Sequence, residues 1–267
     1  MRYQLIVSDV DGTLVDADQH IPALNKRAIT KFERTGGRFT LATGRMPQSA
    51  QPFVDELRIR TPYIVYNGSR IVDPSGQALY NRTLEKAAAA AALEIAGHRE
   101  FTAFLYQEDR ILVERIDARV KRQERKDGVA CVAVGSLEAQ LSFAPTKILF
   151  VGHIEEVPVL LQALTETLGS RAAVARSEPD YVEVLPPGVD KAAALRALCN
   201  TLAIELEQVM AIGDNLNDLE MLRLAGTGVA PANADPEVRA AADVVTSADN
   251  AHGAVAEAIT VALSSRA

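Results

Sequence analysis

The sequence predicts a split α/β domain that carries a second, α+β domain inserted between its halves. Near both ends of the chain, short apolar segments alternate with segments of helical periodicity, which is typical of a parallel sheet with crossover helices. Between about residues 83 and 186 the pattern changes to strand pairs joined by polar turns. We therefore expect a core of residues 1–82 and 187–267, and an inserted domain of residues 83–186.

Apolar runs that end in glycine or polar residues predict the strands of the core, and apolar residues at helical spacing predict its helices. The first half is expected to hold a strand at 5–8, a helix at 21–34, a strand at 38–43, a helix at 47–57 and a strand at 63–66. The second half is expected to hold a helix at 190–203, a strand at 209–213, a helix at 216–224, short strands at 228–230 and 244–245, and a final helix at 253–263.

The inserted domain begins with an Ala-rich segment from Lys86 to Leu93, which favours a helix. A polar turn at 107–110 between two β-rich runs predicts an antiparallel hairpin. The further expected elements are helices at 117–127 and 155–168 and strands at 129–134, 147–151, 172–175 and 181–185. Strand pairs and helices in this order indicate an α+β domain.

Composition limits the function classes. The 267-residue chain has a net charge of −7, which argues against general nucleic-acid binding. Its two cysteines, Cys131 and Cys199, do not suggest a disulfide framework. No apolar run reaches the length of a membrane span, and no signal-like segment precedes Asp9. We expect a cytoplasmic protein with no membrane partner.

Two aspartates one residue apart, Asp9 and Asp11, follow the first apolar strand. Ligands of open α/β sheets bind at the carboxyl ends of the strands. Two carboxylates this close repel each other unless a proton or a cation separates them, which suggests a hard divalent ion. A hairpin turn at Asp11-Gly12 or a Ca²⁺ loop are the alternatives, but neither an alternating return strand nor the downstream Glu of an EF-hand loop follows.

Two other segments suggest an anion site. Thr43-Gly44-Arg45 follows the second strand, where a hydroxyl and a glycine allow backbone N–H groups to approach an anion, although Thr43 is also an ordinary helix cap. Lys191 comes directly after the expected cap Asp190, so its charge opposes the helix dipole. Such a lysine suits a bound anion, and a solvated surface lysine is the alternative.

The segment Gly213–Asp218 repeats the pattern of an acidic residue at a strand end followed by a helix. Asp214 is a candidate ligand for a hard cation, while Asn217 and Asp218 lie in the first helical turn, where polar caps are common. Each segment taken alone has a structural explanation. A shared site at one edge of one sheet explains all four segments together.

These segments resemble a known family. Asp9–Thr13, Thr43–Arg45, Lys191 and Gly213–Asp218 are similar to motifs I to IV of the haloacid dehalogenase (HAD) superfamily of phosphatases. The length and pattern of the insert resemble the type IIB cap of the Cof-type sugar-phosphatase group, and Asn67-Gly68-Ser69 resembles that group's Asn-Gly-Ala segment. The resemblance implies a Rossmann-like core with an inserted α+β cap that selects the substrate.

The resemblance also implies an activity, the Mg²⁺-dependent hydrolysis of a small phosphorylated metabolite such as a sugar phosphate. Asp9 would be the nucleophile that forms an aspartyl-phosphate, and Asp11 would be the general acid and base. Mg²⁺ would be held by Asp9, the backbone carbonyl of Asp11 and Asp214, with Asp218 supporting the metal site.

Lys191 and Thr43 would hold the oxygens of the phosphoryl group, as catalytic and substrate-binding residues. The other expected substrate-binding residues are Gly12, Gly44, Arg45, Asn67 and Asn217. In the cap, Tyr181 and Glu183 are candidates to face the substrate, although an outward position explains Glu183 equally well.

Two alternative functions remain open from the sequence alone. A phosphomutase would use the same aspartyl-phosphate but pass the phosphoryl group to a sugar hydroxyl. A non-catalytic phosphometabolite sensor would be expected to lack Asp9 or Asp11, and both are present. We expect a monomer or a weak homo-oligomer.

Overall fold

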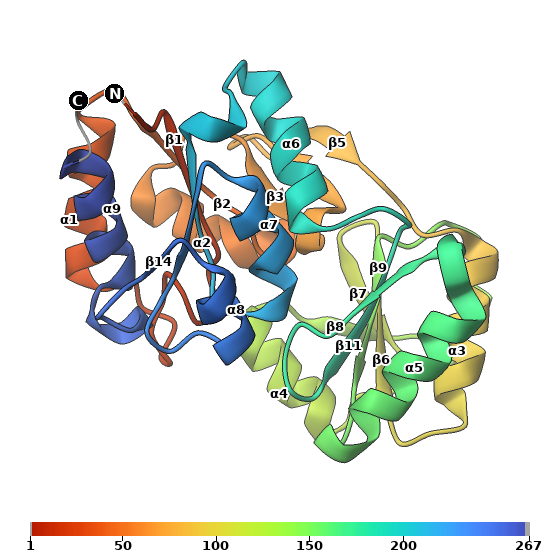
Figure 1. Ribbon diagram of the computed structural model, residues 1–267. Helices are drawn as coiled ribbons and strands as arrows, with labels where there is room; N and C mark the ends of the chain where they lie inside the picture. The colour runs from red at the N-terminus through yellow and green to blue at the C-terminus, as the bar shows by residue number, and fades with distance from the viewer. Residues whose placement is uncertain (1, 265–267) are drawn as a thin grey trace. The chain divides into compact units, whose positions relative to one another are not determined.

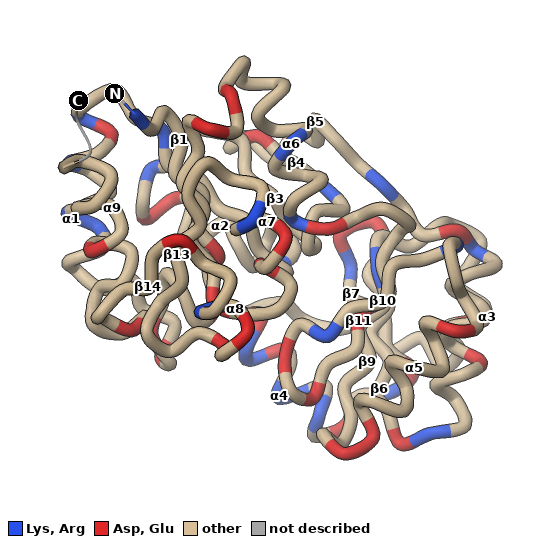
Figure 2. The backbone as a smooth tube through the Cα atoms, viewed as in Figure 1, with Lys and Arg blue, Asp and Glu red and all other residues tan. Residues whose placement is uncertain are grey.

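The computed structural model describes residues 2–264, which pack as two compact units. The core unit consists of residues 2–44, 50–80 and 190–264, and the inserted unit consists of residues 45–49 and 81–189. Lys and Arg are interspersed with Asp and Glu in each unit (Figure 2). Among the described residues, no helix has both the length and the apolar character needed to cross a membrane.

Within the described part of the chain, the core unit is built on a five-stranded sheet in which all paired neighbours are parallel. Its strands, in spatial order, are β14 (Val244–Val245), β13 (Thr227–Ala230), β12 (Val209–Ile212), β1 (Leu5–Ser8) and β2 (Arg38–Leu41). Strand β1 is fully buried between β12 and β2. The residues that follow these three strands therefore meet at one edge of the sheet.

Helices cover both faces of this sheet, which explains why β1 is apolar without alternation. On one face, α1 (Ala23–Glu33) and α9 (Ala254–Ser264) lie side by side (Figure 1). On the other face, α6 (Lys191–Leu202) and α7 (Leu219–Leu224) pack against alternate β-strand residues, including Leu5 and Ala211. The remaining core helices are α2 (Pro47–Leu57), which begins in the inserted unit, and the short α8 (Pro236–Ala241).

The third expected strand differs from the prediction. Strand β3 (Tyr63–Val65) pairs antiparallel with β4 (Arg70–Val72), in a small sheet with β5 (Ala78–Asn81), and it meets the end of β2 only through a parallel bridge between Ala42 and Ile64. The cause is a tight turn after β3 that reverses the chain, so that β3 pairs with the next strand, β4, and does not extend the five-stranded sheet.

The inserted unit contains, within the described residues, a six-stranded sheet in the order β10-β11-β9-β6-β7-β8. Its strands are β6 (Thr102–Gln107), β7 (Arg110–Val113), β8 (Cys131–Ala133), β9 (Lys147–Val151), β10 (Ala173–Ala175) and β11 (Tyr181–Leu185). The predicted hairpin is confirmed, because β6 and β7 are antiparallel. Glu108 and Asp109 join them with φ of 50° and 56°, as a two-residue turn of the primed type requires.

Two helices, α3 (Lys86–Gly97) and α5 (Val157–Leu168), pack on one face of this sheet around Leu105, Phe150 and Val184. A third helix, α4 (Ala118–Asp127), begins at Asp117, whose carboxylate accepts a hydrogen bond from the Val120 amide at 2.9 Å. The chain thus forms a parallel α/β core and an inserted unit whose sheet is mixed but mostly antiparallel.

Glu183 does not have the outward, solvated position that the sequence allowed. It is 3% exposed and pairs with Lys147 at 3.0 Å, and its other carboxylate oxygen accepts a hydrogen bond from Ser177 at 2.6 Å. A charge in such a buried position requires a partner, because an unpaired buried charge is strongly destabilising.

Candidate active site

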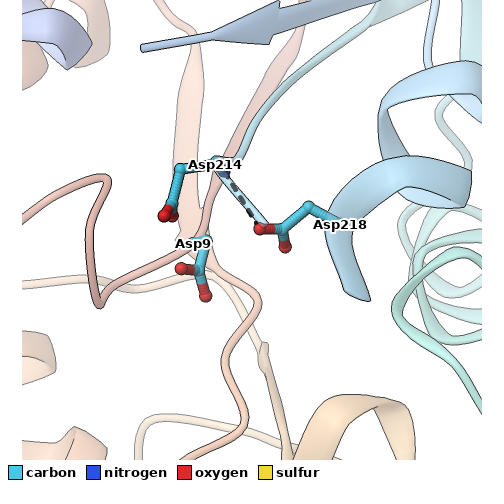
Figure 3. A group of neighbouring side chains, drawn as sticks. All are labelled: Asp9, Asp214 and Asp218. Atoms are coloured by element: carbon cyan, nitrogen blue, oxygen red, sulfur yellow. Dashed lines mark hydrogen bonds between the residues drawn. The ribbon is translucent and has the colours of Figure 1, made fainter. Parts of the chain in front are cut away.

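Three carboxylates gather where β1 and β12 end. Asp9 directly follows β1 and its amide donates to the carbonyl of Ile212 at 2.8 Å, while Asp214 lies two residues beyond β12. Asp218 closes the single turn of 3₁₀ helix η6 (Leu216–Asp218) that precedes α7. The three carboxyl groups point toward one another (Figure 3), with an oxygen of each within 4.8 Å of the others.

Lys191 is the cation of this cluster. It is the first residue of α6, which is capped by Asp190 through a 2.7 Å hydrogen bond from the Ala193 amide. Its Nζ donates to Asp9 Oδ1 at 2.7 Å and to Asp218 Oδ1 at 2.6 Å, and the residue is 1% exposed. Lys191 is therefore not a solvated surface lysine, and its place against the helix dipole is compensated by two carboxylates.

Asp218 is held on both of its oxygens. Oδ1 accepts from Lys191, and Oδ2 accepts from the backbone amides of Asp214 and Asn215 at 3.1 Å each. Asp214 is held separately, because Thr13 Oγ1 donates to its Oδ1 at 2.7 Å. Because both of its oxygens are engaged, Asp218 is suited to orienting Lys191 and the loop. Asp9 and Asp214 are left with the carboxylate oxygens that are more accessible to a cation.

The turn after Asp9 is held by residues to which the sequence assigned no role. Gln19 Nε2 donates to Asp11 Oδ1 at 3.4 Å, and Asn233 Nδ2 donates to the carbonyl of Gly12 at 2.8 Å. Gly12 has φ of 79°, and a Cβ at this position would lie 2.4 Å from Asp214 Oδ2. No local pattern marks Gln19, which acts across a loop. Thr13 closes the Asp9–Thr13 motif, and Asn233-Ala234 resembles the C-terminal segment of the Cof-type group, so both residues could have been found from these segments.

The predicted anion-binding residues of the core unit meet at the same edge of the sheet. Thr43 is fully buried and its carbonyl accepts from the Asn67 amide at 3.0 Å. Gly44 packs against the Asn67 side chain, and Asn217 Nδ2 donates to Asn67 Oδ1 at 3.0 Å. Arg45 belongs to the inserted unit, where its Nη1 donates to Ser49 Oγ at 3.0 Å.

Burial and mutual repulsion raise the pKa values of two carboxyl groups of the site, Asp9 and Asp214. Burial raises the pKa of Asp9 well above its usual range; Lys191 opposes this shift and the other carboxylates add to it. Burial and the charge of Asp218 raise the pKa of Asp214 to about 7. Burial lowers the pKa of Lys191, but the charges of Asp218 and Asp9 outweigh this and raise it above its ordinary value.

The donor set fits a hard divalent cation. Carboxylate oxygens are the ligands that Mg²⁺ prefers, and a cation would offset both the burial of the Asp9 and Asp214 carboxylates and their repulsion by neighbouring carboxylates. One lysine does not balance the three clustered carboxylates of the described residues.

The fold and the site define a class of α/β enzymes with an acidic centre at the carboxyl edge of a parallel sheet. The model of the haloacid dehalogenase-like hydrolases matches residues 6–259, and the chain belongs to this family. The resemblance seen in the sequence motifs is thereby confirmed.

Relatives agree with the family. An HMP-PP phosphatase of Cronobacter sakazakii is 32% identical over 232 residues, covering 87% of this chain and 85% of that protein. An HMP-PP phosphatase of Klebsiella pneumoniae is 30% identical over 244 residues, covering 89% and 87%. The crystal structure of a haloacid dehalogenase-like hydrolase from Bacteroides thetaiotaomicron superposes with a TM-score of 0.87 at 31% identity, covering 97% of this chain and 99% of that one. The protein is a phosphatase of the HAD superfamily.

Proposed function

We propose that the protein is a Mg²⁺-dependent phosphomonoester hydrolase of a small phosphorylated metabolite, with sugar phosphates as the first substrate class to test. The observation that carries the proposal is the buried carboxylate of Asp9, which Lys191 holds at 2.7 Å beside Asp214. A carboxylate held beside a lysine and a cation-binding acid is suited to attack phosphorus, because the positive charges reduce its repulsion from the phosphate.

In the first step, an oxygen of Asp9 forms a bond to phosphorus while the bond from phosphorus to the leaving oxygen breaks. Asp11 donates its proton to that oxygen, which departs as an alcohol. In the second step, Asp11 takes a proton from a water molecule that attacks phosphorus, and the bond between phosphorus and Asp9 breaks. Inorganic phosphate and the original Asp9 carboxylate result. One group serves both steps because the second reverses the proton demand of the first.

Other residues position the phosphoryl group. Lys191 and Thr43 would donate to its oxygens, together with Asn217 and the backbone N–H groups near Gly12 and Gly44, in a reaction where catalysis is mostly positioning and charge stabilisation. Arg45, at the start of the inserted unit, is a further candidate for contacting the leaving group.

Asp9, the backbone carbonyl of Asp11, and Asp214 would hold Mg²⁺, and Asp218 would keep its supporting hydrogen bonds to the loop. When bound, the ion would supply positive charge that offsets the repulsion of the phosphate by the nucleophile. Thr13 keeps one oxygen of Asp214 oriented, so the ligand geometry is prepared before the ion binds.

Gly12→Ala tests this prepared geometry. The new Cβ would collide with Asp214 Oδ2, so we expect the Mg²⁺ concentration for half-maximal activity to rise by about tenfold or more, the usual effect of disturbing the residues that orient metal ligands. Gly36→Ala is the matched control, because Gly36 also has a positive φ, 89°, but has open space around it. Equal Mg²⁺ requirements in the two variants would contradict the prediction. Urea unfolding of both variants separates the cost that they share, a Cβ at positive φ worth about 1–2 kcal/mol, from the effect of the collision.

The function itself is tested by measuring released phosphate over a panel of sugar phosphates, polyol phosphates, pyridoxal phosphate and flavin mononucleotide, compared by kcat/KM. We expect phosphate release with Mg²⁺ and discrimination among the compounds. Isomerised sugar phosphate in place of free phosphate would identify a phosphomutase, and no turnover of any compound would overturn the proposal.

HMP-PP is a second candidate substrate. The specific observation is that two relatives at 32% and 30% identity are HMP-PP phosphatases. HMP-PP therefore belongs in the same panel, and a kcat/KM higher for it than for every sugar phosphate would favour this candidate.

The expected absence of nucleic-acid and membrane partners, the monomeric or weakly oligomeric state and the cytoplasmic location stay predictions.

A further inference from the structure

An unusual turn lies next to the proposed phosphate site. The residues of the 3₁₀ turn η1 (Tyr66–Gly68) all have positive φ: 53° for Tyr66, 52° for Asn67 and 102° for Gly68. Asparagine and glycine tolerate this region, but a buried tyrosine there costs about 1–3 kcal/mol. Such strain persists only where surrounding contacts hold the backbone in place, so the contacts of the turn indicate what it serves.

The turn contacts each of three segments that carry predicted phosphate-binding residues. The Asn67 amide donates to the carbonyl of Thr43 at 3.0 Å. Gly68 packs so closely against the start of α6 that a Cβ would lie 2.1 Å from the carbonyl oxygen of Asp190, the residue before Lys191. Asn67 Oδ1 accepts the hydrogen bond from Asn217 Nδ2 at 3.0 Å. The turn therefore links the segments of Thr43, Lys191 and Asn217.

The contact between the two amides has a direction. Asn217 Nδ2 carries two hydrogens, and Asn67 accepts one of them. Asn217 Oδ1 is buried and has no hydrogen-bond partner among residues 2–264. Rotating the Asn217 amide by half a turn would place its oxygen against Asn67 Oδ1 and lose the hydrogen bond. Asn67 thus determines that Asn217 presents a donor, which is what a phosphoryl oxygen requires.

We propose that Asn67 is a positioning residue that acts through Asn217. Its side-chain carbonyl holds the Asn217 amide so that the second Nδ2 hydrogen donates to the transferring phosphoryl group. The turn backbone keeps Asn67 in register with Thr43 and Lys191. The sequence predicted a direct substrate contact for Asn67, and this role replaces that contact. The inference rests on the proposed phosphate site.

A double-mutant cycle tests the inference. Asn67→Gly removes the acceptor but keeps a residue that tolerates the observed φ, and Asn217→Ala removes the donor. We expect each single variant to lower kcat about tenfold, with KM changed less than about threefold, because the donated bond acts mainly in the transition state. The double variant should be no slower than Asn217→Ala alone. A double variant that shows the product of the two losses would mean that Asn67 acts independently, and the inference would be overturned.

Two controls separate positioning from a general structural effect. Ser69→Ala removes a buried hydroxyl, without a hydrogen-bond partner among residues 2–264, from the position after the turn; it should leave kcat within about twofold of the wild type. Thermal unfolding shows whether the variants fold, and Asn67→Ala is the second variant, with the same expected non-additivity, should Asn67→Gly fail to fold.

Binding of orthovanadate, measured by calorimetry, distinguishes failure of this inference from failure of the proposed function. Vanadate resembles the five-coordinate state of phosphorus, so its affinity should fall about tenfold in each single variant and no further in the double variant. Additive losses of vanadate affinity overturn the inference even if no substrate in the panel is hydrolysed. Absence of turnover by the wild type, with non-additive vanadate losses, would overturn only the proposed hydrolysis.

Discussion

Asp9→Asn is expected to lower phosphate release by at least about 10³-fold, because the amide cannot supply the nucleophilic oxygen. The fold should persist. Lys191 keeps its hydrogen bond to Asp218. Burial raises the pKa of the Asp9 carboxyl group, which means that its charged form is disfavoured in the folded protein, so replacing it with a neutral amide should not prevent folding. Initial rates of phosphate release and thermal unfolding, measured on the same preparation, check both parts of the prediction.

Asp18→Asn is the matched control for that variant. Asp18 is an exposed residue in the loop after the acidic pair, and the same chemical change there should leave the rate within about twofold of the wild type. Near-normal turnover by a clean Asp9→Asn preparation would remove Asp9 as the nucleophile. A loss of folding in that variant would instead assign Asp9 a structural role.

Removal of divalent cations should abolish activity, and addition of Mg²⁺ should restore it. Asp9 and Asp218 share Lys191 as a cationic hydrogen-bond partner, while Asp214 adds a third carboxylate to the cluster. Bringing a phosphate up to these carboxylates costs several kcal/mol in a site of low dielectric constant, so a loss of at least about 10²-fold is expected. Phosphate release is measured after chelation with EDTA and again after Mg²⁺ is returned.

EDTA already saturated with Mg²⁺ is the control for effects of the chelator itself, and it should leave the rate unchanged. A rise in the thermal unfolding temperature on addition of Mg²⁺ would show binding to the folded state without relying on turnover. Full activity after exhaustive chelation would exclude the metal from the mechanism.

The location of the site could be predicted from the sequence because of a property of parallel sheets. Asp9, Thr43 and Asp214 each come shortly after an apolar strand, and the carboxyl ends of parallel strands meet at one edge. Local spacing also predicted Lys191 in the first turn of its helix. These inferences need only the spacing of apolar residues along the sequence and the parallel direction of the strands.

Contacts between distant loops could not be predicted in this way. The Asn217–Asn67 hydrogen bond joins residues 150 positions apart, and the contact of Thr13 with Asp214 joins residues 201 positions apart. Neither contact has a periodic signal, because each depends on where separate turns meet in space. The reversal of the chain after β3 was also missed, although its signal is local, because the turn between Val65 and Arg70 contains Asn67-Gly68, a residue pair typical of hairpin turns.

Periodicity and strand-end chemistry are local properties, so the alternating α/β core, the inserted α+β segment and the acidic and basic residues at the strand ends could be predicted from the residues alone. How those residues are used depends on the folded chain. Folding buries Lys191 between Asp9 and Asp218, and it places the strained turn at Asn67 against Asn217. The pKa shifts, hydrogen-bond directions and packing at the site arise only when distant segments exclude water together.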